Sequence, residues 1–129
     1  MAPTLEHQLK LSGNAQRWLL RENIGIDNLP LGNVAHHSIP LESIKEMPEL
    51  MSKAAKGGFD INGKNNGFSL SNEVHGSNIS NHPVYNQTVL EQLRTIDVNA
   101  KPSLIALEMQ KISDALNDAM RNGSFLPRG

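Results

Sequence analysis

Histidine is the residue type through which this sequence could carry out metal or acid–base chemistry. Four of the five histidines lie between residues 36 and 82: His36, His37, His75 and His82. The chain has no cysteine, which excludes disulfides, thiolate nucleophiles, zinc ribbons and iron–sulfur clusters. Imidazole and carboxylate groups remain as metal ligands, and most carboxylates fall in segments with a helical pattern. The four histidines are therefore the one candidate metal group, and ordinary hydrogen-bonded loop histidines are the alternative interpretation.

The arrangement of these histidines favours chemistry on a phosphodiester. His36 and His37 are neighbours ahead of Pro40, which favours an extended backbone. Adjacent side chains on an extended segment point to opposite sides, so one can bind a metal while the other faces a substrate. His75 and His82 stand around the expected start of a helix, whose backbone amides and dipole attract an anion. Phosphodiester hydrolysis needs a deprotonated water and a cation, and this group could supply both.

Five pieces of sequence, in order, resemble a known family. They are residues 33–40 (NVAHHSIP), 59–62 (FDIN), 66–67 (NG), 75–77 (HGS) and 82–86 (HPVYN). Together they resemble the AHH family of HNH/endonuclease VII-type nucleases, named for its Ala-His-His core. Members of that family are commonly toxin domains at the C-termini of bacterial polymorphic toxins. Residues 21–25, with Pro30 and Gly32, resemble the family's lead-in, so the likeness covers about residues 19–93.

The resemblance implies a ββα-metal core, or His-Me finger, of two short strands, a loop and a helix around one divalent cation (Mg, Mn, Ni or Zn). It makes His37 the general base, and an unperturbed pKa of ~6.5 leaves this imidazole mostly neutral at pH 7. His36 becomes a metal ligand on the other side of the strand. Asn66 is expected to fix the loop so that His37 is held in one orientation, because an amide donates and accepts at once.

The second metal ligand is a choice between two histidines. The family's two later histidines usually stand closer together than His75 and His82 do, as if residues 78–80 had been inserted. Helix N-termini are stiffer than a Gly-Ser-Asn loop, which favours His82 as the ligand. His75 is then expected to complete the metal shell or to contact the phosphate.

The elements that position these residues are mainly helical, so we expect a mostly helical α+β fold. Helices are expected over residues 4–23, broken at Ser12, and over 41–56, split at Pro48. Two further helices are expected to begin at Pro83 and Pro102 and to end near residues 96 and 121. Residues 59–63 and 67–70 alternate around a Gly/Asn turn, and Asn66–Gly67 is itself a turn signal, which predicts a short hairpin or paired extended segments. We divide a single nuclease domain, 1–129, into a helical lead-in (1–28), the ββα-metal core (29–96) and a C-terminal helix (100–122).

Composition narrows the classes of partner. The net charge is −1 over 129 residues, so any contact with nucleic acid must be local. Aromatic residues make up 4%, which argues against a base-stacking platform such as an RNA-recognition sheet. No apolar run reaches the ~20 residues that span a bilayer, and the first ten residues lack a signal-peptide pattern. We therefore expect no membrane insertion and, as written, a cytoplasmic chain.

The expected function is a metal-dependent endonuclease that cleaves DNA as an interbacterial toxin. The resemblance also implies a cognate immunity protein and delivery by a secretion system into the cytoplasm of a target cell. An RNase of the same fold fits the same residues. A third candidate is a non-enzymatic module with structural histidines, in which the stripe Ile105, Met109, Ile112 and Leu116 serves protein association.

Overall fold

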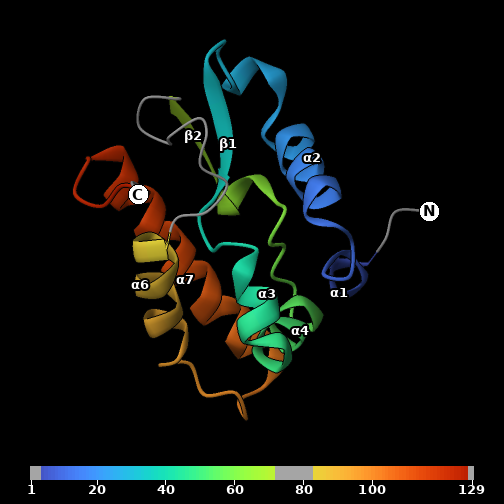
Figure 1. Ribbon diagram of the computed structural model, residues 1–129. Helices are drawn as coiled ribbons and strands as arrows, with labels where there is room; N and C mark the ends of the chain where they lie inside the picture. Colours follow the sequence, from blue (N-terminus) through green and yellow to red (C-terminus); the bar gives the residue numbers. More distant parts are fainter. Residues whose placement is uncertain (1–3, 72–82, 128–129) are drawn as a thin grey trace.

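The computed structural model describes residues 4–71 and 83–127 as a mostly helical α+β protein with a small antiparallel sheet (Figure 1). Helices surround the two strands, with α2 beside β1 and the long α7 passing beneath the sheet. This fold class is the predicted one. The elements are α1 Leu5–Gln8, α2 Gly13–Ile24, β1 Asn33–His37, α3 Glu42–Glu46, α4 Pro48–Lys56, β2 Gly67–Ser71, α6 Pro83–Leu93 and α7 Pro102–Arg121, with short 3-10 helices η1 Ile26–Asn28 and η2 Lys64–Asn66.

Local signals account for the predicted helix boundaries. The Ser12 hydroxyl accepts a hydrogen bond from the Ala15 amide (3.1 Å) and caps the start of α2. Gly25, at φ 88°, ends that helix in a conformation that favours glycine. Pro48 opens α4 and so separates it from α3, and Pro102 opens α7. The predicted breaks at these positions are confirmed.

The predicted pairing of residues 59–63 with 67–70 is wrong, although the extended segment expected at 67–70 is a strand, β2. β2 pairs instead with β1, and the antiparallel register sets His36 opposite Phe68 and His37 opposite Gly67. Residues 59–63 form a turn in which the Asp60 carboxylate accepts the Asn62 amide (3.0 Å). Phe59 on this turn packs into the core, so burial here does not require a strand.

The predicted Asn-Gly turn at residues 66–67 is also corrected. Gly67 has an extended backbone (φ −118°) and begins β2. An added Cβ at this position would lie 2.7 Å from Ile24 Cδ1 and 2.8 Å from Leu20 Cδ1. The glycine therefore allows α2 to pack closely against the strand pair, which brings α2 next to the end of β1.

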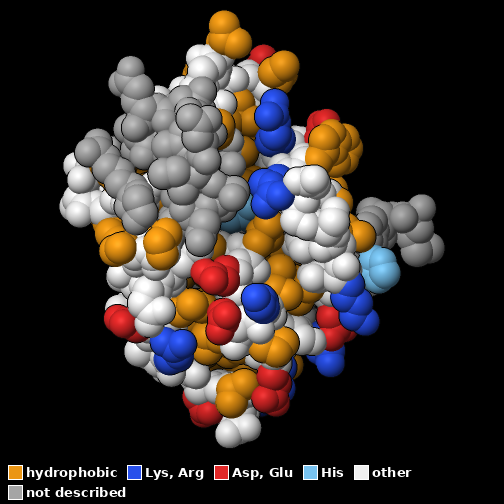
Figure 2. Space-filling view, in the orientation of Figure 1, with side chains coloured by type: hydrophobic (Ala, Val, Ile, Leu, Met, Phe, Trp, Pro, Cys, Tyr) orange, Lys and Arg blue, Asp and Glu red, His pale blue; other side chains and the backbone are white. Residues whose placement is uncertain are grey.

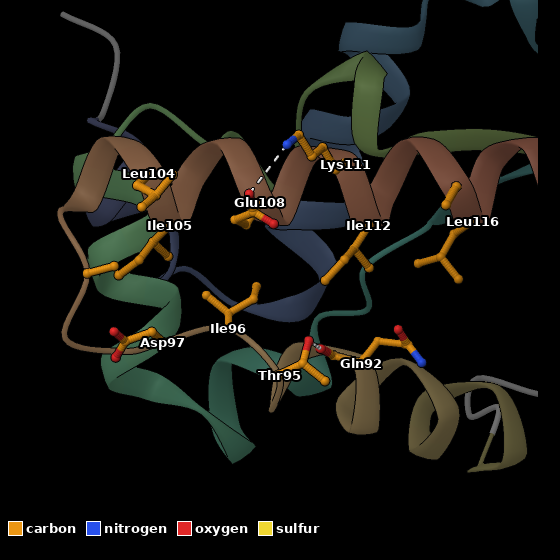
Figure 3. A pocket seen from close by; sticks show the side chains of 12 residues that line it. Gln92, Thr95, Ile96, Asp97, Leu104, Ile105, Glu108, Lys111, Ile112 and Leu116 are labelled. Atoms are coloured by element: carbon orange, nitrogen blue, oxygen red, sulfur yellow. Dashed lines mark hydrogen bonds and ion pairs between the residues drawn. The ribbon is translucent and has the colours of Figure 1, made fainter.

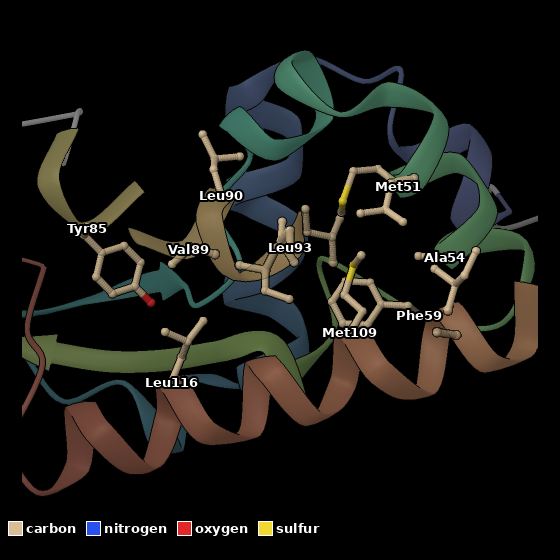
Figure 4. Packing of buried hydrophobic residues seen from close by; sticks show 14 of the residues in the cluster. Met51, Ala54, Phe59, Tyr85, Val89, Leu90, Leu93, Met109 and Leu116 are labelled. Atoms are coloured by element: carbon tan, nitrogen blue, oxygen red, sulfur yellow. The ribbon is translucent and has the colours of Figure 1, made fainter. Parts of the chain in front are cut away.

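The hydrophobic core lies where α4, α6 and α7 meet (Figure 4). Met109 and Leu116 of α7 point toward Val89 and Leu93 of α6, and Met51 of α4 closes the other end. Three of the four residues in the stripe assigned to protein association, Ile105, Met109 and Leu116, are buried in this core. The stripe therefore stabilises the fold, and it cannot serve as the proposed association surface.

A groove of about 560 Å³ separates the end of α6 from α7 (Figure 3). Ile96, Ile105 and Ile112 line it, and an ion pair between Glu108 and Lys111 (3.4 Å) lies on its α7 side. Its lining contains no histidine, so the histidine chemistry is elsewhere. Within residues 4–71 and 83–127, no helix is long and apolar enough to cross a membrane.

Candidate functional site

The end of β1 carries the two adjacent histidines. His36 is 4% exposed and His37 is 7% exposed. The alternation of a strand sends them to different surroundings: His36 meets Tyr85 of α6, and His37 meets the turn after α4. The predicted placement of this pair on an extended segment, with separate contacts, is confirmed.

His37 is held by the side chain of Asn62. The Nε2 atom of His37 lies 2.8 Å from the Asn62 amide oxygen, in a buried contact. The Asn62 amide nitrogen donates to the side-chain oxygens of Gln8 (3.1 Å) and Gln16 (3.2 Å). A further bond from Asn23 Nδ2 to the Asn62 carbonyl (2.7 Å) fixes its backbone. The oxygen and the nitrogen of the Asn62 side-chain amide therefore both have hydrogen-bond partners.

This hydrogen-bond chain determines the tautomer of His37. The Gln16 amide nitrogen donates to the backbone carbonyl of Leu11 (3.1 Å), an atom that can only accept. The Gln16 oxygen must therefore face Asn62, so the Asn62 group that meets it is the NH₂. The Asn62 oxygen is left to face His37, and Nε2 of His37 must carry the hydrogen. The lone pair of the neutral ring is then on Nδ1.

His37 is also held in its neutral form. Burial lowers the pKa of His37 from 6.5 to about 4, because the charged imidazolium is poorly solvated there. The hydrogen bond with Asn62 partly opposes this change, and the positive charge of Arg17 lowers the pKa further. The ring is therefore neutral at neutral pH, and its Nδ1 can accept a proton.

The side chain of Asn66 joins the segments around His37 through hydrogen bonds to other residues. Its oxygen accepts from the Ile39 amide (2.8 Å) and the Ser113 hydroxyl of α7 (2.7 Å). Its nitrogen donates to the carbonyls of Ile39 (3.1 Å) and Ile61 (2.9 Å). The fully buried Asn66 thereby joins the exit of β1 to the turn that carries Asn62. The side chain that contacts His37 is that of Asn62, and the expectation that Asn66 orients His37 stays a prediction.

Tyr85 of α6 packs against the His36 ring and bonds to the backbone that follows β1. The edge of one ring meets the face of the other, with centroids 4.9 Å apart and planes at 78°. The Tyr85 hydroxyl donates to the Ser38 carbonyl (2.7 Å), and its ring stacks on Phe125 (4.9 Å). Burial raises the pKa of Tyr85, so the hydroxyl stays protonated as a donor. α6 thus fixes both the His36 ring and the backbone after β1.

The predicted metal ligands are described only in part. His75 and His82 lie outside the described residues, so their assignment stays a prediction. Among residues 4–71 and 83–127, no three His, Cys, Asp or Glu side chains come together as a metal site. His36 provides one imidazole, a donor that suits Zn²⁺ or Ni²⁺ and that Mg²⁺ rarely selects.

The side chains that hold the two histidines were not predicted from the sequence. Asn62 and Tyr85 stood in two of the quoted sequence pieces, but neither was given a role. Gln16 is a buried polar residue within the apolar stripe of α2, and burial of an amide demands a partner. No spacing in the sequence connects Gln16 with Asn62, because 46 residues separate them.

Comparison with known proteins gives one match. A family model described as "a nuclease family of the HNH/ENDO VII superfamily with conserved AHH" matches residues 19–122. This range includes both histidines of β1, Asn62, Asn66 and Tyr85. Neither the curated proteins nor the solved structures gave a match.

Proposed function

Because the chain belongs to the AHH nuclease family of the HNH/ENDO VII superfamily, we propose that it is a metal-dependent endonuclease that hydrolyses the phosphodiester bonds of DNA. The observation that carries this proposal is the buried His37–Asn62 pair at the end of β1. The order β1, β2, α6 supports a ββα-metal core in which this pair belongs to the first strand and the turn before the second.

In this mechanism His37 is the general base. Nδ1 takes a proton from a water molecule, the resulting hydroxide attacks phosphorus, and the bond to the leaving oxygen breaks. The leaving oxygen takes a proton from solvent. As His37 becomes positively charged, its Nε2–H donates more strongly to the Asn62 oxygen, which stabilises the imidazolium. The neutral starting state of His37 suits this role at pH 7.

His36, together with His82 and His75, would hold one divalent cation. When bound, that cation would neutralise charge on the phosphate and on the leaving oxygen. The edge contact from Tyr85 orients the His36 ring, which limits the directions in which its nitrogens point. His75 has a second proposed role, as a contact to the phosphate.

The biological setting follows from the family resemblance. We propose that the domain acts as an interbacterial toxin, delivered by a secretion system into the cytoplasm of a target cell. A cell that makes it then needs an immunity protein. A partner that met this site would present carboxylates, because these match a local cation and resemble phosphates.

The function is tested by incubating the purified chain with supercoiled plasmid and, in parallel, with total RNA. The expected result is nicking of the plasmid after loading with Mn²⁺, Ni²⁺ or Zn²⁺, and no nicking with excess chelator. Restored nicking after the metal is returned shows that the chelator did not unfold the protein. If total RNA is degraded and the plasmid stays intact, the chain is an RNase and DNA is not its substrate. Cleavage that persists in chelator would contradict a metal-dependent mechanism.

A further inference from the structure

A second groove, of about 800 Å³, lies between α2 and the segment that leads into β1. Its lining includes Trp18 and Arg21 of α2 and Pro30 and Leu31 of the connecting segment. At one end the groove reaches Asn33, the first residue of β1, and the same strand ends at His37. The groove is therefore continuous with the strand that carries the candidate base.

The groove exposes apolar side chains that the fold does not use. Trp18, the single tryptophan of the chain, is 59% exposed, and Ile26 and Leu31 are also exposed. None of the three belongs to the core cluster. Exposed aromatic and aliphatic side chains around a hollow are typical of a binding surface.

Arg17 and Arg21 form a basic row along the side of α2 between Trp18 and the buried stripe. One helical turn separates them, so they lie on the same side. Both are exposed, and no ion pair neutralises either one within residues 4–71 and 83–127. Figure 2 shows basic side chains over α2, close to a small visible patch of histidine.

The basic and acidic side chains of α2 lie on different sides of the helix. Gln16, the residue before Arg17 on α2, bonds to Asn62 (3.2 Å), and Asn62 contacts His37 (2.8 Å), so α2 and its basic row lie beside the candidate site. Glu22, which also lines the groove, follows Trp18 by one turn and lies on the side of α2 away from Arg17. The two arginines and the indole thus lie on neighbouring sides of α2, and Glu22 lies beyond the indole.

We propose that this groove binds a nucleic-acid strand beside the cleaved phosphodiester, with Trp18 stacking on an unpaired base and Arg17 and Arg21 contacting phosphates. The inference rests on the proposed nuclease function and names the form of substrate it prefers. Stacking accepts any base, and it requires a base that is free of its own duplex. The scarcity of aromatic residues excludes a platform of several rings, and a single indole provides one stacking position. A local arginine pair also suits a chain whose net charge is −1.

The single tryptophan makes the test direct. The full chain, kept in excess chelator to prevent cleavage, is titrated with a single-stranded oligonucleotide and with the duplex of the same sequence. Fluorescence of Trp18 and anisotropy of the labelled oligonucleotide are measured together. The expected result is quenching of Trp18 by the single strand, with weaker binding of the duplex.

Substitutions then separate stacking from charge. We expect Trp18→Ala to weaken binding of the single strand about tenfold or more, the size expected for loss of one base stack. Trp18→Phe should recover part of this loss, because it keeps an aromatic face. Arg21→Gln should weaken binding and reduce its dependence on salt. Arg94→Gln, which removes an exposed arginine at the end of α6, should leave the affinity unchanged and serves as the matched control.

Two outcomes would overturn the inference. One is binding reported by anisotropy with unchanged Trp18 fluorescence, which would put the strand elsewhere. The other is no binding of either oligonucleotide, as expected if the groove receives a protein. Both can occur while the metal-loaded chain still nicks plasmid, so a failure here is distinguishable from a failure of the nuclease proposal. Circular dichroism of each variant checks that the fold is intact.

Discussion

Nε2 of His37 and the side-chain oxygen of Asn62 lie 2.8 Å apart in a buried contact between β1 and the turn after α4. The two residues are 25 positions apart in the sequence. The Leu11 carbonyl accepts a hydrogen bond from the Gln16 amide, which fixes the orientation of Gln16 and, through it, of the Asn62 amide. A nuclease base needs one nitrogen that is reliably unprotonated. The hydrogen bonds from Leu11 through Gln16 and Asn62 leave Nδ1 of His37 without a hydrogen, as the proposed base requires, and we call this chain the relay.

The tautomer of His37 is directly observable. In long-range ¹H–¹⁵N spectra of the chain in chelator, we expect the pattern of an Nε2–H imidazole for His37. Asn62→Ala should convert this to a mixture of tautomers, lower the rate of DNA cleavage by at least about tenfold and cost about 1–3 kcal/mol of stability through unpaired buried groups. A parental spectrum with an Nδ1–H ring would contradict the relay.

Asn66→Ala should be one of the most destabilising single substitutions in the chain. It removes four buried hydrogen bonds and leaves the Ile39 amide without its partner. We expect a loss of about 3 kcal/mol in the free energy of unfolding, measured by urea denaturation. Asn65→Ala, at an exposed neighbouring position, should change it by less than about 0.5 kcal/mol. Equal losses in the two variants would refute the assigned role.

Acid should destabilise the protein through His37. Its pKa is lowered to about 4 in the folded state, so between pH 6.5 and 4 the unfolded chain binds a proton that the folded chain does not. This stability is complete above pH 6.5 and is lost progressively as the pH falls toward 4, by about 3 kcal/mol in total. In chelator, His37→Gln should show a smaller loss over this range, since glutamine does not titrate. Parallel pH curves for the two proteins would exclude this role of His37.

Metal affinity should separate ligands from other histidines. Calorimetric titration with Mn²⁺, Ni²⁺ or Zn²⁺ should show affinity reduced by at least about tenfold in His36→Ala and in His82→Ala. His75→Ala should lose mainly cleavage if it contacts the phosphate. Full affinity in His82→Ala with loss in His75→Ala would reverse the two assignments. Unchanged affinity in His36→Ala would move the metal away from β1.

The parts of the fold that were predicted correctly depend on local signals. Ser12, Pro48 and Pro102 each act on the backbone within a few residues, so their effects can be read from the neighbouring sequence. The predicted hairpin pairing was wrong because β2 pairs with residues that lie 30 to 38 positions earlier, from His37↔Gly67 to Asn33↔Ser71. Alternation over residues 59–63 could not reveal that the turn is fixed by its own Asp60 side chain.

The candidate site was predicted unevenly for the same reason. His36 and His37 were found because their types and adjacency are visible in the sequence. Asn62 was missed because its role depends on Gln16, which approaches it only in the folded chain. The pKa of His37 is lowered mainly by burial, and the burial of one residue depends on the fold and cannot be read from its type.

The role of His37 is tested most directly by plasmid nicking with His37→Ala, measured beside His7→Ala, which removes an exposed histidine on α1. Both variants are first shown by circular dichroism to be folded and by calorimetry to bind metal as the parent does. We expect His37→Ala to cleave at least about 10²-fold more slowly, because a general base is lost, and His7→Ala to keep the parental rate. Nicking by His37→Ala at close to the parental rate would contradict the proposal that His37 activates the attacking water.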